Sequence, residues 1–114
     1  MAKLIRLAEH RTKPAFVHFN RTELTLLLNL YARRVAGGEW RDYAIDQGPE
    51  RAVFAIYRHT LEQPLFTITK LGPEAAARSR GGDFIVAAGD RQLARSGSLS
   101  EALRAFDHKP RRVV

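Results

Sequence analysis

The residues best suited to recognition chemistry lie together in the segment 37–46, with the sequence GGEWRDYAID. This segment holds the only tryptophan of the chain, Trp40, followed by Arg41, Asp42 and Tyr43. Tryptophan and arginine are the usual anchors of binding surfaces, so these four residues form a candidate interaction patch. The structural alternative is that Trp40 fills the end of the core while Arg41 and Asp42 lie on a solvated strand face.

Catalytic chemistry finds little support in the sequence. Asp42 and Asp46 share one face of a predicted strand, ~13 Å apart along an extended chain. That separation exceeds the ~5–9.5 Å of paired glycosidase carboxylates. Ser98 is better explained as a helix cap, and the segment 96–98 lacks the glycine spacing of a nucleophile elbow. The chain has no cysteine, which removes thiol catalysis. The sequence therefore favours a non-enzymatic protein and assigns no catalytic residue.

The four histidines do not form a metal-binding pattern. They are His10, His18, His59 and His108, and no two have the four-residue helical spacing of a zinc pair. We therefore predict no bound metal and no cofactor.

Net charge raises the question of a nucleic-acid partner. The chain carries +7 and has a pI of about 10.6. The excess sits at the two ends: residues 1–21 carry a net +4, residues 109–114 carry +3, and residues 22–108 carry zero. Basic ends bind phosphate backbones or simply favour solubility. The candidate phosphate contacts are Lys3, Arg6, Arg11, Lys13, Arg78, Arg80, Lys109, Arg111 and Arg112.

Aromatic residues of the predicted strands offer a second nucleic-acid hypothesis. Phe54, Tyr57, Phe66 and Phe84 would stack on single-stranded bases if they were exposed on a basic sheet face. Their strand alternation and the neutral body of the chain favour the core instead.

A helix over residues 21–36 must position the candidate patch. Asn20 is the predicted N-cap, and Glu23 completes a capping-box spacing. Gly37 and Gly38 are predicted to end the helix. Its apolar stripe contains Leu24, Leu27, Leu28, Tyr31 and Val35, and Leu26 and Leu30 widen it.

Alternating and β-rich segments follow this helix. We predict five strands, over residues 41–46, 51–59, 65–71, 83–88 and 91–96. Residues 15–19 suggest a further short strand, and residues 72–82 an irregular, mobile loop. Gly89 and Asp90 predict a tight hairpin. A second capping box, Ser98 with Glu101, opens a final short helix.

The expected fold class is α+β: an N-terminal capped helix, an antiparallel meander of about five strands and a short C-terminal helix. A meander must cover its apolar face, so both helices are expected on one face of the sheet. We expect a single domain over residues 15–108, with flexible basic tails at 1–14 and 109–114. Neither a secretory signal nor a membrane span is apparent, which predicts a soluble cytoplasmic protein without membrane contact.

Several segments together resemble a known family. They are the block Gly38–Asp46, Arg21–Leu24, Leu30–Tyr31, Ala52–Phe54 and Pro64–Phe66. The chain resembles a family of small alphaproteobacterial proteins known only as a domain of unknown function, over about residues 16–107. The resemblance implies a bacterial, cytoplasmic, single-domain protein and brings no activity, cofactor or catalytic residue.

The leading hypothesis is a non-enzymatic interaction or adaptor domain that binds another protein or a second copy of itself. The alternative is nucleic-acid binding through the basic ends and the loop carrying Arg78 and Arg80. A weaker alternative is a small-ligand or enzyme site near Trp40.

Overall fold

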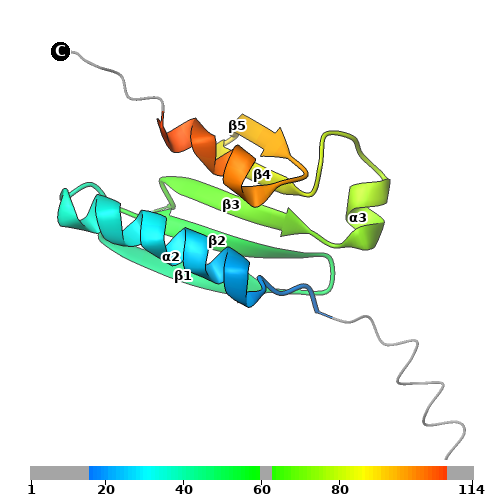
Figure 1. The fold of residues 1–114 in the computed structure, drawn as a ribbon, viewed down its shortest axis with the longest axis horizontal. Coiled ribbons are helices and arrows are strands. Elements are labelled where there is room, and N and C mark those ends of the chain that lie inside the picture. The colour runs from blue at the N-terminus through cyan, green and yellow to red at the C-terminus, as the bar shows by residue number, and fades with distance from the viewer. Residues whose placement is uncertain (1–15, 60–62, 108–114) are drawn as a thin grey trace, which may run out of the picture.

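The computed structural model describes residues 16–59 and 63–107. One long helix precedes a five-stranded antiparallel sheet, in which the strands follow one another in sequence order, and a short helical segment closes the chain (Figure 1). The predicted α+β meander is therefore confirmed. The elements are α2 (Arg21–Ala36), β1 (Asp42–Gln47), β2 (Arg51–Tyr57), β3 (Phe66–Leu71), α3 (Pro73–Ala77), β4 (Phe84–Ala88), β5 (Arg91–Ser96), α4 (Leu99–Ala102) and the 3-10 helix η1 (Leu103–Asp107).

The bounds of α2 match the prediction, and its N-terminus is capped as expected. The Glu23 backbone N–H donates to Asn20 Oδ1 at 2.8 Å, and the Asn20 N–H donates to Glu23 Oε1 at 2.8 Å. Lys70 of β3 reaches the same carboxylate, with its Nζ 2.9 Å from Glu23 Oε1. The cap therefore also ties the start of α2 to the sheet.

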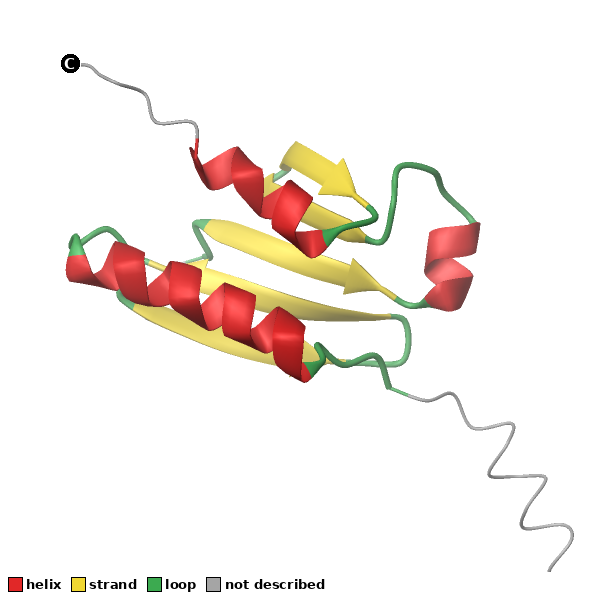
Figure 2. Ribbon diagram, in the orientation of Figure 1, coloured by secondary structure: helices red, strands yellow, loops and turns green. Residues whose placement is uncertain are grey.

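Both helices lie on one face of the sheet, as the sequence predicted. Figure 2 shows α2 running along β1 and β2, with the C-terminal helix (α4 followed by η1) beside it over the later strands. Between these helices and the sheet lies one apolar core. Its buried members are Val17, Phe19, Leu27, Leu30, Trp40, Ala52, Phe54, Ile56, Ile68, Phe84, Val86, Leu99, Ala102 and Phe106.

The short strand expected over residues 15–19 is not present. Residues 16–19 belong to no strand, and Ala15 lies outside the described residues. Val17 and Phe19 are buried while Phe16 and His18 are exposed, so side chains alternate here as they would in a strand. The Val17 N–H donates to the Gly48 carbonyl at 2.8 Å, a contact with a turn rather than a strand ladder.

The segment 72–82 is not wholly irregular, because it contains the short helix α3. Gly72 takes an extended conformation at its N-cap, and Pro73 occupies the first turn, where its missing N–H costs nothing. Glu74 and the following alanines favour a helix. The prediction of an irregular loop therefore missed this short helix.

The C-terminal helix is capped only in part as predicted. The Glu101 N–H donates to Ser98 Oγ at 3.4 Å, but the Ser98 N–H donates to Ser96 Oγ at 3.1 Å. Ser96 thus takes the place that the capping-box prediction gave to the Glu101 carboxylate.

Both predicted tails, over residues 1–14 and 109–114, lie outside the described residues. No helix among the described residues is long and apolar enough to cross a membrane.

Gly82 should tolerate no side chain, because it lies against the end of β5. Its φ is +110°, and an added Cβ would lie 2.2 Å from the Ser96 carbonyl carbon. Gly89 also has a positive φ, +61°, but has open space around its Cα. We expect Gly89→Ala to lower the free energy of unfolding by ~1 kcal/mol. Gly82→Ala should lower it by ~3 kcal/mol or more.

Urea unfolding of the two alanine variants measures this difference. Equal losses at the two positions would contradict the close approach of Gly82 to β5.

Candidate functional site

Trp40 lies in the core and not on the surface. Its side chain is 3% exposed and meets Phe106 edge-to-face, with ring centroids 5.4 Å apart. Phe66 of β3 lies 6.0 Å from Trp40 and 5.1 Å from Phe106. These three rings join the α2–β1 connection, the sheet and the C-terminal helix. Trp40 therefore fills the end of the core, which was the structural alternative to a surface patch.

Arg34, in the last turns of α2, closes this aromatic cluster. Its guanidinium carbon lies 5.4 Å from the Trp40 ring centroid and 5.9 Å from that of Phe106. One guanidinium nitrogen pairs with Glu39 at 3.0 Å, and the other donates to the Phe106 carbonyl. The role of this arginine could not be predicted, because its partner Phe106 is distant in the sequence. We call Arg34, Trp40, Phe66 and Phe106 the aromatic corner.

The other members of the predicted patch lie on β1 or just before it. Arg41 is exposed and Asp42 is half-buried. Asp42 Oδ1 accepts the Tyr43 N–H at 2.9 Å. Tyr43 is 38% exposed, yet its ring packs on Tyr31 at 4.8 Å. Trp40 is thus not exposed together with its neighbours, whereas Arg41 and Tyr43 are accessible.

Tyr31 lies beneath this accessible surface. Burial raises the pKa of its phenol, and the nearby Asp42 carboxylate and Tyr43 raise it further. The phenol therefore stays neutral under physiological conditions, and Tyr31 acts as a packing residue between α2 and β1.

Four exposed apolar side chains lie where α2 runs along β1. They are Leu28, Val35, Tyr43 and Ile45, with exposed fractions of 37%, 39%, 38% and 37%. Leu28 and Val35 lie one helical turn before and after Tyr31, on the side of α2 that faces β1. Tyr43 and Ile45 point to the helix side of β1, since they pair with the core residues of β2. We call these four residues the α2–β1 margin.

The two edge strands of the sheet differ in how open they are to a further strand. β5 has a register shift opposite Val86 and Ala87, and it carries Arg91 and Arg95. Such an irregularity discourages pairing with another strand. Charge does not distinguish the two edges, because β1 also carries two charged residues, Asp42 and Asp46. β1 keeps an unbroken register with β2 along its whole length. β1 is therefore the edge strand open to a further strand, and it lies beside the α2–β1 margin.

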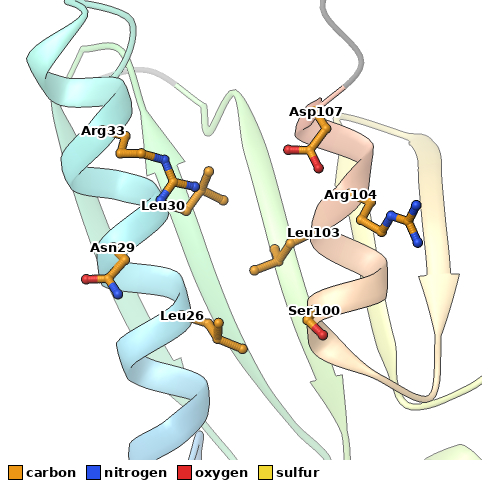
Figure 3. Close-up of a pocket in the computed structure, with 8 residues that line it drawn as sticks. All are labelled: Leu26, Asn29, Leu30, Arg33, Ser100, Leu103, Arg104 and Asp107. Atoms are coloured by element: carbon orange, nitrogen blue, oxygen red, sulfur yellow. The ribbon is translucent and has the colours of Figure 1, made fainter.

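A groove of about 220 Å³ separates α2 from the C-terminal helix (Figure 3). Leu26 and Leu30 point into it from α2, and Leu103 faces them from η1. Arg33 and Asp107 are among its polar lining residues. The groove can admit an apolar side chain. In the sequence, only the broad leucine stripe of α2 could have indicated it. Its leucines are less accessible than the margin residues.

The predicted phosphate contacts are only partly visible. Arg78 caps the C-terminus of α3, Arg80 follows it, and both are exposed. The others lie outside the described residues: Lys3, Arg6, Arg11, Lys13, Lys109, Arg111 and Arg112.

The described residues contain no cluster of three or more His, Asp or Glu side chains that would hold a metal ion. His18 Nδ1 lies 3.0 Å from Gln47 Oε1, at the C-terminal end of β1. His59 follows β2, which runs antiparallel to β1, and so lies near the opposite end of β1. His10 and His108 lie outside the described residues.

The platform hypothesis for the strand aromatics is not supported by their burial. Phe54 and Phe84 are buried, and Phe66 packs in the aromatic corner. Tyr57 points to the other face of the sheet, since it pairs with Asp42. These rings offer no common stacking surface.

Comparison with known proteins finds a matching family model. The family model described as protein of unknown function DUF2794 matches residues 17–103. No curated protein and no solved structure matches the chain. The match confirms the resemblance to a family of unknown function over nearly the range expected from the sequence. Because the matched residues make up most of the chain, the protein belongs to the DUF2794 family.

Proposed function

We propose that this protein is a non-enzymatic interaction domain that binds an extended, apolar segment of a partner protein along β1. The observation that carries the proposal is the α2–β1 margin, where four large apolar side chains are exposed beside a regular edge strand. Exposed apolar side chains that gather in one place mark interaction sites more often than scattered ones do.

Strand addition suits both parts of this surface. An edge strand presents unpaired N–H and C=O groups, which an added strand satisfies. Alternate side chains of the added strand would face the helix side of the sheet. There they would meet Leu28 and Val35 of α2 as well as Tyr43 and Ile45 of β1. Backbone hydrogen bonds would supply affinity, and the apolar contacts would select the segment.

The residues of the candidate patch have different roles in this proposal. Arg41 and Tyr43 are accessible and contact the partner segment. Trp40 acts indirectly, because its buried ring fixes the connection that sets the start of β1. Asp42 holds the Tyr43 backbone through its own carboxylate. The absence of cysteine and the resemblance to a bacterial family support a bacterial cytoplasmic setting.

Photo-crosslinking from β1 tests this proposal directly. A benzophenone amino acid replaces Ile45 in the full chain, and the protein is irradiated in its native cells. Leu93 of β5 supplies a matched control, because its exposed fraction is also 37%. We expect a defined partner adduct from position 45 and none from position 93.

A charge on the margin should abolish that adduct. Val35→Lys buries an ammonium group against an apolar partner and should reduce the position-45 adduct at least tenfold. Leu93→Lys should leave it unchanged. Equal adducts from both edges, or an adduct insensitive to Val35→Lys, would refute the assignment of β1 as the binding edge.

A second candidate function is nucleic-acid contact, supported by the exposure of Arg78 and Arg80 and by the basic chain ends. Phosphate contacts make the logarithm of affinity fall linearly with that of salt, with a slope of about −0.9 per contact. If Arg78 and Arg80 each contact a phosphate, the double alanine variant should flatten that slope by about 2. A titration of random-sequence DNA and RNA measures it, and no binding at low salt would exclude this function.

A further inference from the structure

The second face of the sheet is free of both long helical segments. α2 and the C-terminal helix lie on the same face, and α3 lies beyond the end of β3 (Figure 1). The middle of the uncovered face carries small or β-branched side chains that are half-buried: Val53, Thr67, Thr69, Ile85 and Ala87. Ala55 of β2, on the same face, is buried. An antiparallel sheet can leave one face to water, but such a face is normally polar.

The pairing register arranges this face in rows that cross all five strands. One row reads Asp46, Val53, Thr69, Ile85 and Arg95 from β1 to β5. It has an acid at one edge, an arginine at the other, and apolar residues on both sides of a central threonine. When the row is read from β5 to β1 instead, apolar residues again occupy the second and fourth positions. The charges at the two ends are then exchanged.

The three central positions of the neighbouring row are also symmetric. It reads Ala44, Ala55, Thr67, Ala87 and Gln92, again with a central threonine on β3 and an alanine on each side. Small side chains at matching positions allow two such faces to approach closely.

A third, shorter row repeats the charge pattern. Arg51 of β2 pairs with Leu71 of β3, and the Leu71 N–H donates to the Asp83 carbonyl at 2.8 Å. Asp83 immediately precedes β4, so strand alternation places it on the face of Ile85. Arg51 and Asp83 thus flank Leu71 with opposite charges.

We propose that this face is the interface of a homodimer, in which two sheets pack face to face about a two-fold axis parallel to the strands and above β3. This axis lays β1 of one copy over β5 of the other and β2 over β4. Asp46 then meets Arg95 of the second copy, and Arg51 meets Asp83 of the second copy. Val53 meets Ile85 of the second copy, while the β3 threonines meet their own counterparts.

A hollow on this face lies where the dimer places the incoming arginine. It measures about 280 Å³, lies at the β1–β2 turn, and is lined by Asp46, Glu50, Arg51, Val53 and neighbouring turn residues. In the dimer, Arg95 of the second copy lies over this part of β1. Arg95 is held in place within its own chain, since its Nε donates to the Gly82 carbonyl at 2.9 Å and a terminal nitrogen donates to Ser79 Oγ at 2.7 Å.

Charge disfavours a face-to-face arrangement about an axis perpendicular to the strands. An axis perpendicular to the strands would lay β1 over β1, which brings Asp42 and Asp46 near the same residues of the second copy. Like charges placed opposite one another in an interface are destabilising. The parallel axis replaces this repulsion by attraction at both edges.

The size of the face predicts a dimer that dissociates on dilution. Strands ~4.8 Å apart and about six residues long at ~3.3 Å each give a face of roughly 500 Å² per copy. Standard stable interfaces bury about 800 Å² per copy. The interface leaves the α2–β1 margin free, because the margin lies on the helix side of the sheet, so the dimer does not depend on the proposed partner binding.

Sedimentation equilibrium of the full chain over a range of concentrations tests the dimer. We expect the mass to rise from that of the 12.9 kDa chain towards twice that value. Arg51→Asp and Asp83→Arg, both at exposed positions, should each weaken dimerisation at least tenfold, and the double variant should restore it. Asp46→Arg should weaken it likewise. Asp107→Arg, an exposed change on the helix side, should not.

Circular dichroism of each variant confirms that it is folded. A chain that stays monomeric at all concentrations would overturn the proposal. A dimer that none of the reversals at Asp46, Arg51 and Asp83 weakens would overturn it equally, since the interface would then lie elsewhere.

Discussion

The arrangement of this protein depends on the packing of Arg34 between Trp40 and Phe106. One guanidinium lies over both rings, pairs with Glu39 and donates to the Phe106 carbonyl. A planar, always charged group with several donors can make these contacts at once, and lysine cannot. The contacts join the end of α2, the connection to β1 and the C-terminal helix. Both helical segments are therefore held to the same face of the sheet.

One-sided coverage has consequences on both sides of the sheet. On the helix side, α2 reaches only to the line of β1, so Tyr43 and Ile45 remain accessible at the margin. On the other side, half-buried apolar and threonine side chains face outward. Both proposals follow from this asymmetry. A partner strand fits the α2–β1 margin, and a second copy fits the sheet face that no long helix covers. A dimer would carry two margins, which increases avidity for a partner with repeated segments.

Local sequence signals were enough to predict most of the fold. The Asn20–Glu23 capping box and the leucine stripe defined α2, and alternation defined the five strands. The prediction failed where local signals were weak or ambiguous, as in α3, where Gly72 and Pro73 suggested a loop but cap a short helix.

The candidate site was less predictable, because it depends on tertiary contacts. The types of Trp40 and Arg41 suggested a surface patch, but burial of Trp40 is decided by Phe66 and Phe106, which are distant in sequence. The charge symmetry of the sheet face without helices could not be predicted either, because it depends on which strand residues pair. Its most direct test is carbodiimide crosslinking of Arg95→Lys in a mixture of ¹⁴N- and ¹⁵N-labelled chains. Asp46 and residue 95 of one chain lie ~19 Å apart, too far for an amide bond. The account predicts an amide between Asp46 of one isotope and Lys at position 95 of the other, and the lack of any such mixed link would contradict it.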